Sequence, residues 1–324
     1  MSSFIRIGLA LGAVLGPLLR FLNKRRTTAA FSVEQLQTAE FHLGEACRDS
    51  KCKAHAETVA RESRRYVSSE QGSVFKNRFR ATACLIDLRL YQSCAAYLAA
   101  VSKATEGKYR RSANKAKRLG YYVRPVNPAS FSKSVQDIRG SKFWRSRGPM
   151  LSGFLARSAH VTDEEHAVEK PSCREHWTIA WGVFSDAGGK RKMVGRAVLR
   201  RSGNVVSFDE FMGHGDLLAL GITKLLMFDI MEWILDRTDP CVQGLDYCLQ
   251  GSMEDGGKGL VDWKRYTQFE PRSIKGGVRR MFQIPDDFDV AQYLKLNPDV
   301  KDAGLDARRH YVSHGVHEGR AYRE

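Results

Sequence analysis

A change in the spacing of apolar residues between positions 176 and 274 restricts the possible fold of this chain more than any other feature. Apolar and polar residues alternate over three segments, which are His176–Phe184, Met193–Arg201 and Val205–Met212. The sequence Ser-Gly-Asn at 202–204 separates the last two segments and indicates a hairpin turn. Over Leu217–Ile234 the apolar residues recur at helical spacing instead. These patterns predict three strands followed by a long helix.

The remainder of this region adds a strand, a short helix and a final strand. The strand is expected at Val242–Leu249, the helix around Leu260–Tyr266 and the last strand at Phe269–Ile274. Strands and helices in this order predict an α+β or α/β domain whose mixed sheet is flanked by helices.

The order of these elements and three short motifs resemble the GNAT acyltransferase fold. Gly221–Leu226 is similar to the Gly-x-Gly/Ala segment that opens the central helix of that family. Trp263–Pro271 is similar to a late run of an aromatic residue, Lys and Arg followed by Gly-Phe-x-Pro, with Gln268 at the position of the family's glycine. Arg147–Met150 resembles a loop that precedes the core in FemAB-like bacterial proteins. The resemblance implies transfer of an acyl group from acyl-CoA, the cosubstrate, to an amine-bearing acceptor.

The start of the central helix is the expected binding site for the phosphates of the donor. A helix N-terminus binds phosphate through its free backbone amides and its dipole. Here those amides would come from Gly221, Ile222, Thr223 and Lys224. The alternative is that Gly221 is an ordinary glycine inside a helix that begins earlier, with Asp216 as its N-cap.

Four side chains are candidates for moving protons during acyl transfer. Glu210 or His214, at the end of the third strand, is expected to act as the general base for the amine. Tyr247 and Tyr266 are candidates for protonating a leaving thiolate. The alternatives are that Glu210 is solvated, that His214 caps a turn and that Tyr247 only packs in the core.

Alternation along the third strand also predicts which face of the sheet its last side chains occupy. Asp209 and Phe211 are expected on one face, and Glu210 and Met212 on the other. At most one of the two carboxylates would then face a cleft.

The chain has a formal net charge of +16, and over half of this excess lies between residues 101 and 150. That region holds thirteen Lys and Arg residues against two acidic ones, a difference of +11. Its centre, Lys108–Arg118, is expected to be a basic helix that ends near Gly120, and Tyr121–Val126 a strand. Such a basic and aromatic surface would suit nucleic acid, anionic lipid head groups or only solvent. The sequence contains none of the common nucleic-acid-binding signatures.

Residues 4–22 are apolar apart from two arginines, and basic residues follow directly at 24–26. The uninterrupted apolar run, Ile7–Leu19, has 13 residues, whereas a membrane-spanning helix needs about 20. We expect this N-terminal segment, residues 1–31, to attach a cytoplasmic protein to the inner face of the membrane. A targeting peptide and a segment that packs on the protein itself are the alternatives.

Residues 32–120 are expected to form a helical arm, because stretches such as Val74–Ala100 carry apolar residues at helical spacing. The acyltransferase domain would then occupy residues 121–284. The seven cysteines are scattered, and their spacings match neither a disulfide framework nor a zinc motif. We therefore expect reduced thiols and no metal.

Residues 285–324 resemble a short repeat of bacterial proteins that are linked to polysaccharides and glycosyltransferases. The matching positions include Phe288, Asp289, Asn297–Val300 and Glu318–Arg320. We expect two short helices held together by Tyr293 and Tyr311, and an interaction module rather than a second active site. We interpret His310, His314 and His317 as packing around Gly315, with a shared metal ion as the alternative that their spacing allows.

Three functions fit these observations. The first is a membrane-associated N-acyltransferase that modifies an amine acceptor in cell-envelope or polysaccharide biosynthesis. The second is a non-catalytic, membrane-associated adaptor. The third is an RNA-binding protein that uses the basic region 101–150.

Overall fold

The computed structural model divides the chain into two compact units, Met1–Lys275 and Gly276–Glu324, and each is described by itself. The described residues are 36–43, 50–63, 65–66, 81–142, 144–145, 148–149, 162–186, 189, 191–253, 257–276, 284–285, 287–311, 315 and 320–323. The N-terminal segment expected at a membrane, residues 1–31, lies outside them. Within these ranges no helix is both long enough and apolar enough to cross a bilayer.

In the described part of the first unit, eight strands form one mixed sheet in the order β1-β10-β2-β9-β8-β7-β6-β3. β8 and β9 are parallel, and their neighbours on both sides pair antiparallel. The strands are β1 (Thr38–Phe41), β2 (Ala83–Asp87), β3 (Tyr122–Val126), β6 (His176–Ser185), β7 (Lys192–Ser202), β8 (Val205–Gly213), β9 (Tyr247–Ser252) and β10 (Glu270–Gly276). The predicted α+β fold with a mixed sheet flanked by helices is confirmed, including the hairpin between β7 and β8.

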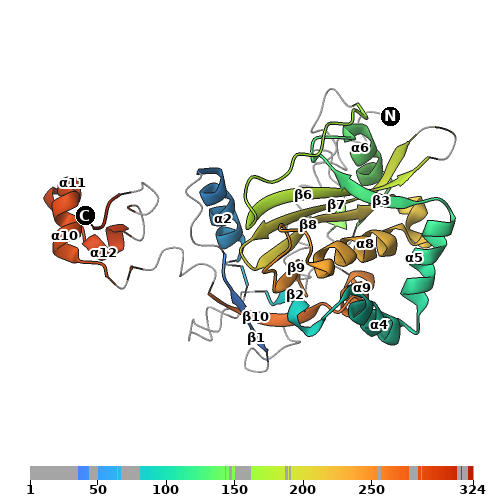
Figure 1. The fold of residues 1–324 in the computed structure, drawn as a ribbon, viewed down its shortest axis with the longest axis horizontal. Helices are drawn as coiled ribbons and strands as arrows, with labels where there is room; N and C mark the ends of the chain where they lie inside the picture. The colour runs from blue at the N-terminus through green and yellow to red at the C-terminus, as the bar shows by residue number, and fades with distance from the viewer. Residues whose placement is uncertain are drawn as a thin grey trace, which may run out of the picture. The chain divides into compact units, whose positions relative to one another are not determined.

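Helices cover both faces of this sheet, as Figure 1 shows. One face carries α2 (Ser50–Ser63) and α6 (Ser132–Gly140), and the other carries four helices. These four are α4 (Cys94–Thr105), α5 (Lys108–Arg118), α8 (Ile222–Asp236) and α9 (Lys258–Tyr266). Shorter elements are the 3-10 turns η2 (Leu88–Leu90) and η4 (Gly215–Leu220), and a two-stranded piece of β4 (Trp144–Arg145) and β5 (Gly148–Pro149).

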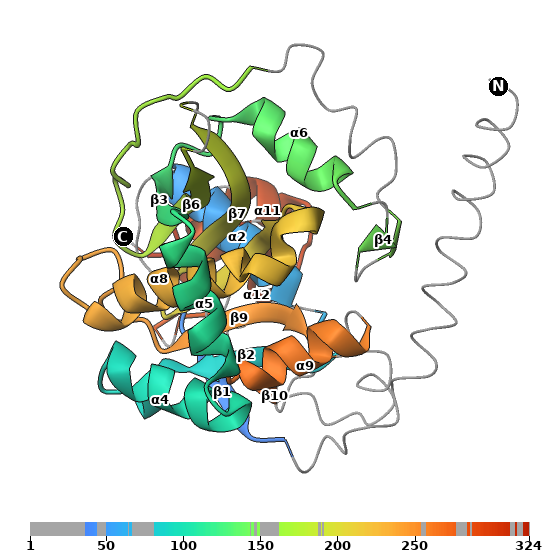
Figure 2. The ribbon, with the colours of Figure 1, turned by 90° about the vertical axis from the view of Figure 1, so that its right-hand side faces the viewer.

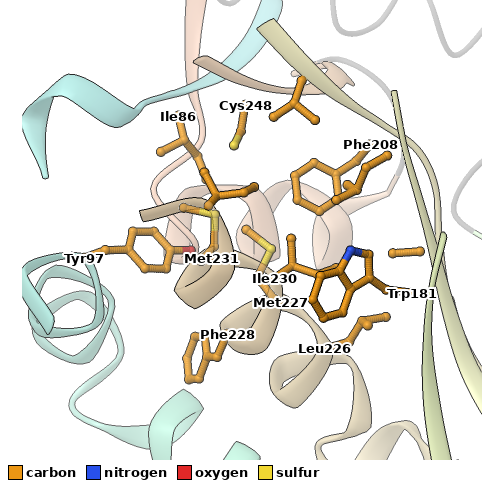
Figure 3. Packing of buried hydrophobic residues seen from close by; sticks show 14 of the residues in the cluster. Ile86, Tyr97, Trp181, Phe208, Leu226, Met227, Phe228, Ile230, Met231 and Cys248 are labelled. Atoms are coloured by element: carbon orange, nitrogen blue, oxygen red, sulfur yellow. The ribbon is translucent and has the colours of Figure 1, made fainter. Parts of the chain in front are cut away.

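The main core lies between the sheet and α8, which is apolar on most of its surface (Figure 3). Nine of its fifteen residues are buried, so α8 contacts the sheet on one side and α4 and α5 on the other. A helix that is apolar nearly all round must be covered nearly all round. The smaller core on the opposite face joins α6 to the sheet through Val135 and Ile138.

The region expected to be a helical arm contributes two strands to the sheet. β2 pairs with both β9 and β10, and its first four residues are fully buried. A short apolar run that is buried on both faces has no two-residue alternation, so its sequence resembles a buried helix. Residues 74–80 of the helix expected over Val74–Ala100 lie outside the described residues, and the rest is replaced by β2 at Ala83–Asp87 and by α4 from Cys94 onward. The strand expected at Val242–Leu249 begins later, at Tyr247.

The second unit is a small bundle of short helices, α10 (Val290–Leu296), α11 (Pro298–Asp302) and α12 (Ala307–His310). Its aromatic centre contains Tyr293 and Tyr311, whose ring centroids are 5.5 Å apart, as the sequence predicted. A Cβ at Gly315 would overlap the Tyr293 hydroxyl, so this glycine is needed for close packing. His310 Nδ1 lies 3.0 Å from the same hydroxyl, whereas His314 and His317 are outside the described residues.

Truncation of Leu226 tests the central position of α8, because this side chain is fully buried between the sheet and its covering helices. We expect Leu226→Ala to lower the free energy of unfolding by about 2–5 kcal/mol, since it leaves a cavity. Urea denaturation measures this loss. The same change at Leu90, which is 67% exposed, should cost no more than about 0.5 kcal/mol. Equal losses at the two positions would contradict the packing described here.

Candidate functional site

The two halves of the sheet are joined through β8 and β9, and these two strands pair over only part of their length. Their described pairing runs from Val205 opposite Tyr247 to Ser207 opposite Leu249. Beyond this point β8 remains paired with β7 as far as Gly213, and β9 remains paired with β2 as far as Ser252. The two halves of the sheet therefore separate after Ser207 and Leu249. Backbone groups that are unpaired at such a divergence need another partner, and a ligand can supply it.

A β-bulge lies in β8 next to this divergence. Leu199 of β7 is opposite Phe208, and its neighbour Val198 is opposite Glu210, so Asp209 is the extra residue. Bulges redirect side chains and are common beside active sites. Because of the bulge, Phe208 and Phe211 both face α8, which simple alternation would not allow.

Both carboxylates of β8 are paired with arginines on the face of the sheet covered by α2 and α6. Glu210 accepts a hydrogen bond from Arg139 of α6 at 3.1 Å and lies 3.5 Å from Arg196 Nε. Asp209 is 2.6 Å from Arg200, so the expectation that it shares a face with Phe211 is wrong, and the bulge is the reason. The Glu210 contacts fit the attachment of α6 to the sheet better than a free general base.

His214 follows β8 directly and differs from Glu210 in its surroundings. Its side chain is 20% exposed, and its Nδ1 atom is buried without a hydrogen-bond partner among the described residues. The nearest recorded charge is the Asp216 carboxylate, 3.8 Å from that nitrogen. A buried ring nitrogen that has no hydrogen-bond partner can accept a proton or a hydrogen bond from a ligand. Of the two predicted bases, Glu210 is paired with two arginines, whereas His214 has a ring nitrogen without a hydrogen-bond partner among the described residues.

The start of α8 is where the phosphate-binding amides were predicted. The helix begins at Ile222 with Gly221 as its N-cap, so the alternative of a helix that starts near Asp216 is wrong. Residues 215–220 form the 3-10 turn η4 instead. Gly221 has a φ of 92°, a conformation that favours glycine, and a Cβ there would overlap the Ser112 carbonyl oxygen of α5. This glycine therefore permits close approach of α5 to α8.

Helix α5 packs against α8, as Figure 2 shows, and it brings Ser112 and Tyr109 to the first turn of α8. Lys224 is half-buried under α5, with its Nζ 5.5 Å from the centroid of the Tyr109 ring, and burial lowers the Lys224 pKa. On α5 a groove of about 560 Å³ is lined by Arg111, Asn114, Lys117 and Arg118. Of the four predicted amides, that of Gly221 donates to the Leu218 carbonyl and that of Lys224 to the Gly221 carbonyl, which leaves those of Ile222 and Thr223 for a phosphate.

The two predicted tyrosines occupy different environments. Tyr247 is 3% exposed, its hydroxyl accepts a hydrogen bond from the Glu40 amide, and burial raises its pKa. It pairs with Val205, at the joined end of β8 and β9, away from the divergence. Tyr266 is 41% exposed at the end of α9, with its ring centroid 5.7 Å from that of Tyr109. Tyr247 therefore has the surroundings of a packing residue, and Tyr266 remains accessible.

Two polar side chains at the divergence were not predicted. Gln250 follows the last β9 residue that pairs with β8, is 8% exposed, and has an Oε1 atom without a hydrogen-bond partner in the described residues. Lys264 of α9 is 1% exposed and donates to the Ser252 carbonyl at 2.5 Å. Beside it the Trp263 ring lies 5.1 Å from that of Phe211. Helix α9 thus fills one side of the divergence with aromatic rings.

No family model and no curated protein matches this chain. Among solved structures, it is similar to L-PGS from Bacillus licheniformis, with 13% identity over 52% of this chain and 44% of that chain at a TM-score of 0.30. It is also similar to the C-terminal domain (DUF2156) of a lysylphosphatidylglycerol synthetase, described as putative, from Agrobacterium fabrum, with 14% identity over 59% and 58% of the chains at 0.35.

A tandem GNAT protein from the clavulanic acid biosynthesis pathway is similar over 73% of this chain and 59% of that chain, with 11% identity and a TM-score of 0.33. The chain spans about half the length of these three structures. At such values the fold assignment rests on the observed strand order and on the divergence of β8 and β9.

Three glycine substitutions separate the roles of backbone conformation and close packing near α8. We expect Gly221→Ala to destabilise most, because it has both a positive φ and the overlap with Ser112. Gly120→Ala has a φ of 83° and open space, and should cost about 1–2 kcal/mol. Gly259→Ala in α9 has neither obstacle and should be neutral or stabilising by up to about 1 kcal/mol. Thermal unfolding ranks the three, and a Gly221 variant as stable as the Gly120 variant would refute the contact.

Proposed function

We propose that the first unit is a GNAT-like transferase that moves an acyl group from acyl-CoA to an amine-bearing acceptor. The observation that carries this proposal is the divergence of β8 and β9 after three recorded pairs, while each strand keeps its outer neighbour. A sheet that separates in this way offers unpaired backbone groups to an extended, amide-containing donor. The pantetheine arm of CoA has that chemistry.

The donor would lie along the last residues of β8, with Gln250 on the opposite strand. The buried Oε1 of Gln250 can accept a hydrogen bond from a pantetheine amide, which removes the cost of leaving it unpaired. The phosphates would extend toward the amides of Ile222 and Thr223, because the Lys224 amide already donates to the Gly221 carbonyl. Lys224, which lies in the first turn of α8, would supply a cation for this contact.

His214 would remove the proton from the attacking amine, and Tyr266 would supply one to the leaving thiolate. The proposal for His214 is supported by its unpartnered Nδ1 at the open end of β8. Tyr266 is supported by its exposure at the end of α9. Glu210 would instead hold α6 against the sheet through Arg139. This division of roles assigns one base to the acceptor side and one acid to the leaving thiolate.

The acceptor would come from the cell envelope or from polysaccharide biosynthesis, with the N-terminal segment keeping the enzyme at the inner face of the membrane. This part of the proposal is supported by the apolar and basic sequence of residues 4–26 and by the repeat-like tail. A non-catalytic adaptor built on the same segments is the competing proposal, and donor binding distinguishes the two.

Binding of CoA measured by thermal unfolding tests the transferase proposal. We expect CoA or acetyl-CoA at millimolar concentration to raise the melting temperature, since a ligand present at 100 times its Kd adds about 2.7 kcal/mol of stability. Gln250→Leu should leave the unliganded protein folded but reduce this shift, because it removes the buried acceptor atom. Gln243→Leu, the same change at an exposed position, should keep the full shift. If no CoA derivative stabilises the wild-type chain, the adaptor proposal replaces this one.

A second candidate function, binding of RNA or of a tRNA-borne donor, is favoured by the basic groove on α5. We expect RNA affinity to fall steeply with salt, and replacing both Arg111 and Arg118 by Gln to reduce the slope of log K against log salt by about 0.7–0.9 per removed contact. Lys103→Gln on the exposed side of α4 is the control and should not change the slope. Fluorescence anisotropy measures the affinity, and equal slopes in all variants would exclude this groove as the binding surface.

A further inference from the structure

Three metal-binding side chains from two separate parts of the chain meet on the face of the sheet covered by α2. Cys52 is in the first turn of α2, Cys173 precedes β6, and His176 is its first residue. One ligand atom of each, two thiol sulfurs and an imidazole nitrogen, lies within 4.8 Å of the other two. Cys52 and His176 are buried and Cys173 is half-buried, so the cluster is largely shielded from solvent.

The backbone fixes the tautomer of His176. Its Nε2 atom lies 2.9 Å from the Leu43 carbonyl oxygen, and a carbonyl oxygen can only accept a hydrogen bond. The ring proton is therefore on Nε2, and Nδ1 carries a lone pair. That Nδ1 atom lies 3.5 Å from Cys173 Sγ. Metal-binding histidines usually donate their second ring N–H to a carbonyl or carboxylate in this way, which orients the ring.

The spacing of the cluster fits a tetrahedral zinc ion. Zinc bonds of about 2.3 Å to sulfur and about 2.0–2.1 Å to nitrogen, at a tetrahedral angle, place the two ligand atoms about 3.6 Å apart. The separation between Cys173 Sγ and His176 Nδ1 is 3.5 Å. Two thiolates and one imidazole also form the donor set that zinc prefers over harder cations such as Mg²⁺.

We propose that Cys52, Cys173 and His176 bind a zinc ion that fastens α2 and the segment ending at Leu43 to the first residue of β6. The sequence has the same Cys-x-x-His spacing twice, Cys52 with His55 and Cys173 with His176, and three of these four residues form the cluster. The His55 ring is 6.0 Å from that of His176, and its Nε2 is 2.6 Å from the Arg201 carbonyl, so His55 has the same tautomer. The proposed ion would be structural, because the cluster lies on the face of the sheet opposite α8.

Zinc content of the full-length chain, purified without a histidine tag or chelator, is the direct test. We expect about one zinc ion per chain by mass spectrometry of the metal, and less than a tenth of that in Cys173→Ser and in His176→Asn. Cys94→Ser is the matched control, because Cys94 is a half-buried thiol in α4, outside the cluster, and it should keep its zinc. Replacement by Co²⁺ should give a thiolate-to-cobalt charge-transfer band, which the Cys173 variant weakens.

A second measurement keeps the test valid if the cluster variants fold poorly. Chelator added to the folded wild-type chain should lower its melting temperature, and added Zn²⁺ should restore it, whereas Cys94→Ser should respond like wild type. A chain that holds no zinc and is not stabilised by Zn²⁺ would overturn the proposal. So would a Cys52–Cys173 disulfide found by mass spectrometry of the protein as purified, since oxidised sulfurs cannot bind the ion.

Discussion

The packing of α8 against both halves of the divided sheet is the interaction on which the first unit depends. β8 and β9 share only a short parallel ladder in the described residues, so backbone hydrogen bonds alone hold the halves together weakly. Side chains of α8 belong to one buried cluster with Cys248 and Ile86 from one half and with Trp181 and Phe208 from the other (Figure 3). Burial of this apolar surface lets the strands separate without loss of the domain. The proposed site between β8 and β9 is compatible with a stable domain only because α8 joins the two halves of the sheet.

The covering helices determine what can reach that site. Close approach of α5 to Gly221 places a basic helix over the start of α8, and Lys117 of α5 lies 3.3 Å from Asp229 of α8. Burial raises the Asp229 pKa, and the Lys117 ammonium opposes that shift. On the other side, α9 inserts Trp263 and Lys264 next to the divergence. The donor proposed here would therefore meet positive charge at one end and aromatic surface at the other.

Much of the fold could be predicted from local patterns, but the partners and the orientation of the site residues could not. The hairpin strands and α5 lie where their periods indicated, whereas α8 begins five residues later than its period indicated, after the 3-10 turn η4. Gln268 has a φ of 69°, a backbone conformation that favours glycine, and no local pattern predicted it. Glu210 has an ordinary sequence context, and its pairing with Arg139 comes from a residue 71 positions away. Alternation was misleading at Asp209, because a bulge adds one residue and leaves no local signal.

The sequence by itself determined the secondary structure of most of the domain, its excess positive charge and the glycine that begins α8, because these follow from spacing, composition and backbone conformation. Only the tertiary structure decided that β2 belongs to the sheet and that Lys264 is buried. It also decided that Cys52 meets Cys173 and His176, which are more than a hundred residues further along the chain. Contacts between distant segments depend on how whole elements pack, and that packing leaves no periodic trace in either segment.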